Sequence, residues 1–279
     1  MSIYSLHFGD FEGTLTLDFH KTKVITVMRA LPLVFLLALF SFSCSSIQTI
    51  QRSTDVSPLV GSTQLLLMIA SDWKDTTGVL NQFQRNSDTD DWIPIGDSIP
   101  VIFGKKGLGW GSGIHPLRGN GPKKVEGDGR TPAGVFRLPF AFGYASQTQA
   151  GNLKIPYEQM LGISDCVDDT SSEFYNNIVR RDSTKPTLWN HSEKMLLSDD
   201  DYRWGVFIAH NSNPATRGGG SCIFLHVASN PDLPTTGCTA MSLKSMEEII
   251  RWLDAGEFPV LVQLTSGEYE KLKKDWNLP

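Results

Sequence analysis

A histidine and a cysteine near the end of the chain have the types and the spacing needed for covalent catalysis. His226 lies at the end of the apolar run 221–227, and Cys238 follows a loop, directly after Gly237. A thiol attacks a carbonyl only as the thiolate, so it needs a base or a cation nearby. A histidine at the end of a strand can face a loop cysteine. The pair therefore predicts acyl transfer through a thioester.

The loop around the cysteine favours this interpretation over a structural one. Taken alone, Cys238 fits a small buried hydrophobic residue, and His226 fits a core histidine whose ring nitrogens are both satisfied. Gly237, however, permits unusual backbone angles, so the N–H groups of Gly237 and Cys238 can converge into an oxyanion hole. A helix expected near Ser242 would place the positive end of its dipole close by, which favours a thiolate.

Short apolar segments must form the strands that position these residues. Strands are expected within the ranges 64–70, 79–85, 92–96, 99–103, 205–209, 221–227 and 259–264. A helix is expected over 242–254, with an apolar face and with Gly256 after its last turn. We therefore predict a mainly β fold, a β-rich α+β domain whose mixed strands form a sandwich-like or barrel-like structure with a few helices.

The segment 150–203 is a polar insertion with interspersed acids and bases. It either caps the site or forms a solvated surface. Because charged side chains are rarely buried, we favour the solvated surface.

Composition limits the possible functions. The chain has 279 residues, 40% hydrophobic and 20% charged, with a net charge of −5, as expected for a globular protein of one or two domains. No basic run is long enough to indicate nucleic-acid binding. The four cysteines form no C-x-x-C pair, so we expect no metal site.

An apolar run near the N-terminus predicts export. Residues 30–42 are too few to span a bilayer but match the core of a signal peptide, and Lys21, Lys23 and Arg29 supply its positive flank. Cys44 follows among serines, as in a lipoprotein signal whose cysteine is lipidated. A plain secretory signal or an uncleaved anchor are the alternatives.

These features divide the chain into three parts. Residues 1–47 are an N-terminal extension with the signal, 48–62 are a polar tether, and 63–279 are the catalytic domain. Acidic residues within 1–27 are unusual ahead of a signal peptide, so we expect translation to start at Met28.

The motifs resemble those of a known family. The segment around the cysteine is similar to the catalytic core of L,D-transpeptidases of the YkuD type, whose signature is a histidine, a spacer and Ser/Thr-His-Gly-Cys. His226, Thr235, Gly237 and Cys238 occupy four of these positions, whereas Thr236 replaces the second histidine. Upstream, residues 131–136 resemble the family's Thr-Pro-x-Gly-x-Phe turn. The resemblance extends over about residues 63–265.

This resemblance implies a YkuD-type fold and a two-step reaction on peptidoglycan stem peptides without a cofactor. Cys238 would attack the carbonyl that joins an L-centre to a terminal D-residue, with His226 as base and then acid. The thioester would be opened by an amine of a neighbouring stem or, in a carboxypeptidase or wall-protein-releasing hydrolase, by water. A catalytically silent wall-binding lipoprotein is a third possibility, supported by the loss of the histidine at Thr236.

The resemblance leaves some roles to be assigned. A backbone carbonyl is the expected group that orients His226, and Thr235 and Thr236 would support the motif. Arg130 and Arg217 are candidates for binding substrate carboxylates. We expect a monomer in the periplasm or cell envelope, bound to a membrane if Cys44 carries a lipid.

Cys166 and Cys222 have two interpretations. Export permits a disulfide between them. Alternatively, Cys222 is a small strand residue packed in the core, which is the interpretation we favour.

Overall fold

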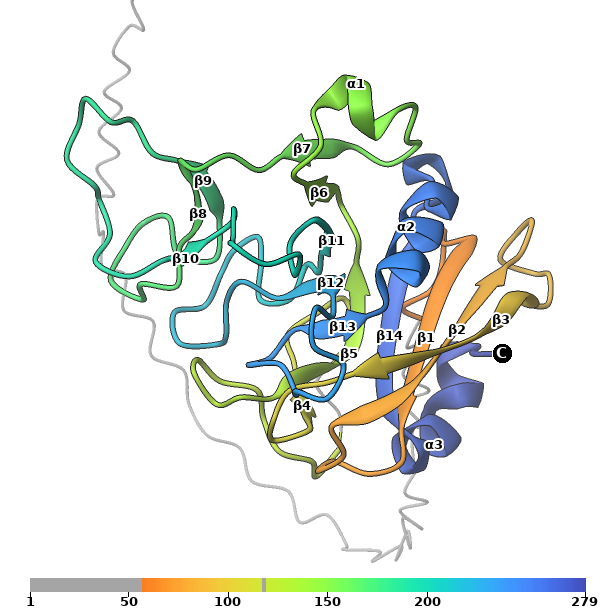
Figure 1. Ribbon diagram of the computed structural model, residues 1–279. Coiled ribbons are helices and arrows are strands. Elements are labelled where there is room, and N and C mark those ends of the chain that lie inside the picture. The colour runs from red at the N-terminus through yellow and green to blue at the C-terminus, as the bar shows by residue number, and fades with distance from the viewer. Residues whose placement is uncertain (1–56, 117–118) are drawn as a thin grey trace, which may run out of the picture. The chain divides into compact units, whose positions relative to one another are not determined.

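The computed structural model describes residues 57–116 and 119–279, so Cys44, Met28 and most of the tether lie outside the described residues (Figure 1). None of the helices in these ranges is long and apolar enough to cross a bilayer. The strands are β1 (Gln64–Ala70), β2 (Thr77–Gln84), β3 (Ile93–Ile102), β4 (Leu108–Trp110), β5 (Thr131–Arg137), β6 (Ala141–Gly143), β7 (Tyr157–Gln159), β8 (Ser164–Cys166), β9 (Ile178–Arg180), β10 (Glu193–Lys194), β11 (Trp204–Phe207), β12 (Phe224–Val227), β13 (Thr239–Met241) and β14 (Val260–Thr265). The helices are α1 (Gln147–Ala150), α2 (Leu243–Trp252), the 3-10 helix η1 (Ala255–Glu257) and α3 (Ser266–Trp276).

Most strands belong to one mixed sheet. Its order is β4-β5-β14-β1-β2-β3-β13-β12-β11-β6-β7, and β8, β9 and β10 form a second, antiparallel sheet of three strands. The sheet contains parallel pairs such as β1–β14 and β12–β13 as well as antiparallel pairs such as β1–β2. The prediction of a mainly β fold with a few helices is confirmed.

The centre of the large sheet is formed by continuous apolar runs. β1 and β14 are almost completely buried, including Leu65, Leu66, Leu261 and Val262. A strand that is apolar on both faces must be covered on both sides. Figure 1 shows α3 beside β1 and β14, and α2 packs against β11 and β12. These strands form the main hydrophobic core.

Helix α2 follows β13 and has the expected apolar face; residues 228–238, which connect β12 to β13 and contain Cys238, are called the site loop below. Ser242 caps it, because its hydroxyl accepts a hydrogen bond from the Ser245 N–H at 3.1 Å. The helix ends at Trp252, two residues before the predicted end at 254, and Leu253 is its C-cap, so the expected role of Gly256 at the end of its last turn is wrong. Gly256 instead lies in η1, where the Asp254 side chain accepts its N–H at 2.9 Å.

The insertion 150–203 is only partly the solvated surface that we favoured. It contains β7 to β10 and a fully buried carboxylate, Asp165, which pairs with Arg181 and Lys194 at 2.9 Å each. The favoured interpretation is wrong there, because partners of opposite charge offset the cost of burying Asp165. In Figure 1 the β8–β10 sheet lies on the side of the domain away from β1–β3.

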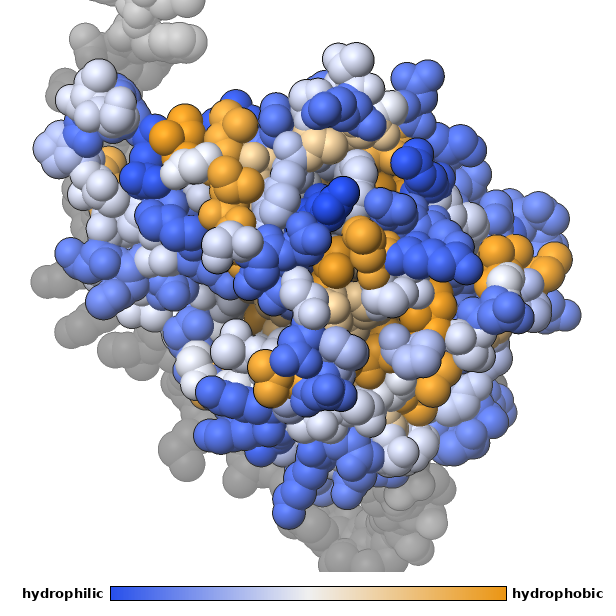
Figure 2. Space-filling model, viewed as in Figure 1, coloured by the Kyte–Doolittle hydropathy of each residue, from blue (hydrophilic) through white to orange (hydrophobic). Residues whose placement is uncertain are grey.

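Charged and polar side chains cover most of the face seen in Figure 2, and hydrophobic side chains form small separate groups on it. Single exposed apolar residues are normal on a soluble surface. This face therefore has no broad apolar surface.

Candidate active site

Cys238 lies at the junction between the site loop and β13, where two backbone groups hold its sulfur. The Phe224 N–H donates to Sγ at 3.3 Å, and the thiol donates to the Cys222 carbonyl at 3.5 Å. The residue is 6% exposed. Burial, together with the nearby Glu193 charge, raises the pKa of the thiol. The resting side chain is thus a neutral thiol that needs a base to become a nucleophile.

His226 is the side chain suited to act as the base for the Cys238 thiol. It lies in β12, and its Nδ1 is 2.7 Å from the Val227 carbonyl. This contact matches the expectation that a backbone carbonyl orients the ring. An Nδ1–H that donates to the carbonyl leaves Nε2 as the acceptor nitrogen. Burial lowers the pKa of His226, so the ring is neutral at pH 7 and able to accept a proton.

The pairing of β12 with β13 brings the two residues to one cavity. The strands run parallel, with Leu225 opposite Thr239 and His226 opposite Ala240. Both His226 and Cys238 line a cavity of about 330 Å³. Its wall also contains Glu193, Leu197, Asp199, Asp201, Tyr202, Ala228, Ser229, Asn230, Leu233, Pro234, Thr235, Thr236 and Ala240.

Two threonines fix the backbone of the nucleophile. The Cys238 carbonyl accepts a hydrogen bond from Thr235 Oγ1 at 2.7 Å and another from Thr131 Oγ1 at 2.9 Å. Thr131 begins β5, so residues 131–136 are a strand and not the turn that their motif indicates. Through Thr131, the upstream motif directly supports the nucleophile.

Gly237 has the backbone freedom that we expected, but its amide is engaged. Its φ is +154°, and its N–H donates to Thr235 Oγ1 at 3.1 Å. A Cβ at this position would come within 3.2 Å of the Arg130 carbonyl and 3.6 Å of Lys124 Nζ. An oxyanion hole that uses the Gly237 N–H therefore requires the Thr235 hydroxyl to release it.

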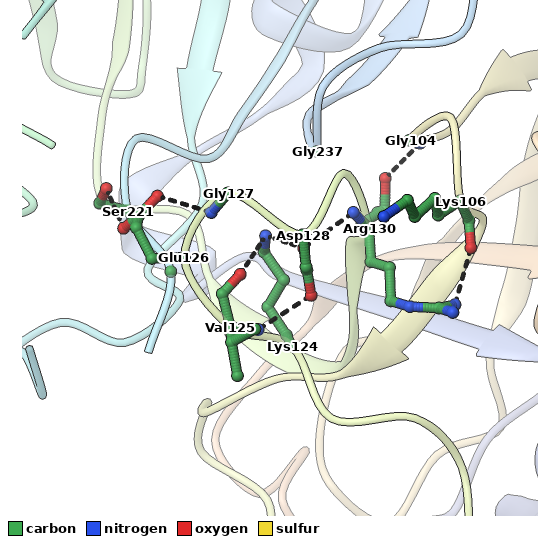
Figure 3. A network of polar contacts seen from close by, with 12 residues as sticks. Gly104, Lys106, Lys124, Val125, Glu126, Gly127, Asp128, Arg130, Ser221 and Gly237 are labelled. Carbon is green, nitrogen blue, oxygen red and sulfur yellow. Dashed lines mark hydrogen bonds and ion pairs between the residues drawn. The ribbon is translucent and has the colours of Figure 1, made fainter. Parts of the chain in front are cut away.

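A buried ion pair lies beneath this glycine (Figure 3). Lys124 Nζ is 2.6 Å from Asp128 Oδ1 and donates to the Val125 carbonyl at 3.0 Å. The Lys124 charge lowers the pKa of Cys238, although less strongly than burial raises it. Lys124 thus partly offsets the effect of burial on the thiol.

The two predicted substrate-binding arginines do not line the cavity. The Arg130 guanidinium donates to the carbonyls of Lys106 and Leu108 at 2.7 and 2.9 Å, and Figure 3 shows it pointing away from Gly237. Arg217 is exposed and donates to the Ser171 carbonyl at 3.1 Å. The structure therefore brings together His226, Cys238 and the threonines but not the arginines.

Comparison with known proteins adds the family. The family model of the YkuD L,D-transpeptidase catalytic domain matches residues 89–262, more than half of the chain. This protein belongs to the YkuD family. Comparison with curated proteins and with solved structures finds no significant match.

The YkuD domain of this chain contains a disulfide that we did not favour. Cys166 in β8 is bonded to Cys222, so the interpretation of Cys222 as a packed free cysteine is wrong. Cys222 has a φ of +54°, and its N–H donates to Asn176 Oδ1 at 2.9 Å. This backbone position turns Cys222 toward the insertion. The bond therefore links the insertion to the carbonyl that accepts the Cys238 thiol.

Two residues of this YkuD site were missed by sequence reasoning. Tyr202 and Glu193 line the cavity, and the Tyr202 hydroxyl hydrogen-bonds Glu193 Oε1. Both are in the segment 150–203, where Glu193 is one acid among many. A tyrosine in the loop two residues before β11 was the available signal, because functional side chains often lie in loops held by a rigid scaffold.

Proposed function

We propose that this chain is an exported cysteine acyltransferase that acts on peptidoglycan stem peptides through a thioester on Cys238. The observation that carries the proposal is the shared cavity of Cys238 and His226, in which His226 is neutral and held by the Val227 carbonyl. Membership in the YkuD family supports the class of substrate.

The first half-reaction follows from these positions. His226 Nε2 takes the proton of the Cys238 thiol as the sulfur attacks the carbonyl carbon between the L-centre and the terminal D-residue. Backbone N–H groups of Gly237 and Cys238 stabilise the oxyanion once the Thr235 hydroxyl releases the Gly237 amide. The C–N bond then breaks, and the leaving amine takes the proton from His226. A thioester remains.

The second half-reaction opens the thioester. A neighbouring stem supplies an amine, whose proton passes to His226 and then to the Cys238 thiolate as the new amide forms. If water replaces the amine, the same steps give hydrolysis. Thr236, which also lines the cavity, has no basic group and leaves His226 as the base of the motif.

The disulfide supports an extracytoplasmic location, because such bonds persist in oxidising compartments. We place the chain in the cell envelope as a monomer, with Cys44 as the site of a lipid anchor. Mass spectrometry of the mature N-terminal peptide tests the anchor. An added diacylglyceryl mass on Cys44 is expected, and a peptide that contains an unmodified Cys44 would contradict the anchor.

The activity is tested with purified muropeptides that carry tetrapeptide stems. We expect cross-linked dimers or trimmed monomers from the wild type, and neither from Cys238→Ala. His226→Gln should reduce product formation by about 10²-fold or more, the usual contribution of a positioned base. The matched control is His191→Gln, which changes an exposed histidine of the insertion. If the wild type forms no product yet binds sacculi as well as Cys238→Ala does, a non-catalytic wall-binding role replaces the proposal.

A further inference from the structure

A buried tyrosine and a partly buried glutamate form a hydrogen-bonded pair in the wall of the active-site cavity. The Tyr202 hydroxyl hydrogen-bonds Glu193 Oε1, and both residues face the cavity that contains Cys238 and His226. Tyr202 and Cys238 also belong to one cluster of buried side chains, and interaction with the Tyr202 hydroxyl lowers the pKa of the Cys238 thiol, although burial raises that pKa more strongly. Tyr202 therefore contacts the carboxyl group and packs in the same cluster as the sulfur.

Aromatic packing holds the tyrosine ring in one orientation. Tyr202 is 3% exposed, and its ring makes edge-to-face contacts with Phe142, Phe224 and His226 at centroid distances of 5.9, 5.5 and 5.3 Å. Such contacts restrict the ring at little entropic cost. The hydroxyl is thus preorganised, and only its proton can change direction.

The small sheet delivers the glutamate. Glu193 begins β10 and lies opposite Cys166 of β8. Cys166 is bonded to Cys222, whose carbonyl accepts the Cys238 thiol. Glu193 is therefore connected to Cys238 through the pairing of β10 with β8, the Cys166–Cys222 disulfide and the hydrogen bond of the thiol to the Cys222 carbonyl.

A tyrosine hydroxyl has one proton to donate. When Glu193 is ionised it can only accept, so the Tyr202 proton points to the carboxylate. When Glu193 is protonated its own O–H donates to the Tyr202 oxygen, and the Tyr202 proton is free to point to the sulfur. A hydrogen bond to a charged acceptor is worth about 1.5–3 kcal/mol, so the direction of this proton affects how easily the thiolate forms.

We propose that Tyr202 is a further catalytic residue whose hydroxyl donates a hydrogen bond to the Cys238 thiolate, and that Glu193 is the positioning residue that decides whether this proton points to the sulfur. The proposal rests on the proposed function, because it concerns the same nucleophile.

The charges around the pair give Glu193 a role at neutral pH. Burial raises the pKa of Glu193, the hydrogen bond from Tyr202 lowers it and the charge of Asp168 raises it, so that the pKa is about 7. Below that pH the Glu193 carboxyl is mostly neutral, and the Tyr202 hydroxyl is free to donate its hydrogen bond to the Cys238 thiolate. Above that pH, the Glu193 carboxylate accepts the hydrogen bond of the Tyr202 hydroxyl, and its negative charge opposes the ionisation of Cys238. The titratable groups that face Glu193 are Asp168, Asp199, Asp201, Tyr202, His226 and Cys238.

The test measures the alkylation rate of Cys238 by iodoacetamide in the purified full-length protein between pH 5.5 and 9, with the Cys238 peptide quantified by mass spectrometry. Tyr202→Phe should lower the rate about tenfold to hundredfold at pH 6.5, the fold-change equivalent to one hydrogen bond to a charged group. Glu193→Gln should match the wild type near pH 6 and exceed it about threefold or more at pH 8, because the amide cannot ionise.

Two variants serve as matched controls. Tyr157→Phe removes a tyrosine hydroxyl that donates to the Ala145 carbonyl at 2.8 Å outside the cavity. Glu247→Gln neutralises a carboxylate that accepts from the Trp204 indole at 3.1 Å. Both should keep the wild-type pH profile of alkylation.

The outcomes separate this inference from the proposed function. A wild-type enzyme that makes products, combined with Tyr202→Phe and Glu193→Gln profiles identical to the wild type, overturns the inference alone. A folded wild type that makes no products but shows the expected alkylation profiles removes the proposed function and leaves the Tyr202–Glu193 effect on the thiol intact. If Tyr202→Phe unfolds the protein, the Glu193→Gln profile at pH 8 decides the matter, and the absence of any increase contradicts the inference.

Discussion

The centre of the large sheet and the region around Cys238 are stabilised in different ways. In β1 and β14, side chains such as Leu66 and Val262 are fully buried among other apolar groups, and regular ladders satisfy the backbone. Around the site, a disulfide and the Asn176 side chain fix the position of Cys222, and the buried carboxylate of Asp165 pairs with Lys194 of β10. Apolar packing tolerates small movements, whereas such single polar contacts define the geometry that chemistry requires.

This contrast suggests that stability and reactivity depend on different parts of the domain. Loss of packing in the sheet should lower the free energy of unfolding and leave the chemistry of folded molecules unchanged. Loss of a polar or covalent link beside Cys238 should alter both.

Leu66→Ala should have the largest effect on stability. The side chain is fully buried in β1, so we expect a loss of about 2–5 kcal/mol from transfer and cavity formation. Denaturant unfolding measures the loss. The Cys238 alkylation rate per folded molecule should match the wild type; a rate reduced in proportion to stability would contradict the separation of the two regions.

Removal of the disulfide in Cys166→Ala/Cys222→Ala should cost about 2–4 kcal/mol, because the bond closes a long loop of the unfolded chain. In contrast to Leu66→Ala, we expect slower acylation of Cys238 as well, since the Cys222 carbonyl and β10 lose their connection. Acylation rates compared between the two variants at equal folded fraction show the difference. Equal acylation rates in the two variants would show that the disulfide does not contribute to the reactivity of Cys238.

Gly237→Ala should cost about 1–3 kcal/mol of local strain, because its φ of +154° disfavours a Cβ and the new atom would lie 3.2 Å from the Arg130 carbonyl. We expect this strain to appear mainly as a lower rate of acylation, with the melting temperature reduced by only a few degrees. Gly267→Ala, at an open position, is the control. A melting temperature that falls while the rate is kept would show that Gly237 has only a structural role.

Arg217→Ala should have the smallest effect. The side chain is exposed and lies outside the cavity, so we expect a change within about 0.5 kcal/mol in stability and a KM for muropeptides near that of the wild type. A KM raised about tenfold would restore Arg217 as a substrate-binding residue.

The sequence allowed the main fold and the pair of reactive residues to be predicted. Apolar runs such as 64–70 and 259–264 indicate strands wherever they pack, and the His226–Cys238 spacing follows directly from one strand and one loop. These signals are local, so they can be recognised in the sequence without knowledge of the tertiary contacts.

The remaining parts of the site depend on contacts between distant segments. Glu193 resembles the other acids of its segment in the sequence, and only the pairing of β10 with β8 brings it to the wall of the cavity. Cys222 reads as a strand residue until its φ of +54° turns it toward Cys166. Tyr202 gains its role only because β12 and the site loop place His226 and Cys238 beside it.

The most direct test of the central claim is to locate the acyl-enzyme. The full-length protein is incubated with a carbapenem, whose strained lactam carbonyl acylates a reactive thiolate, and the adduct is mapped by mass spectrometry. We predict one adduct, carried by the peptide that contains Cys238, absent from Cys238→Ala and formed at least about 10²-fold more slowly in His226→Gln. An unmodified Cys238 in a folded protein that still converts muropeptides would contradict the assignment of Cys238 as the nucleophile.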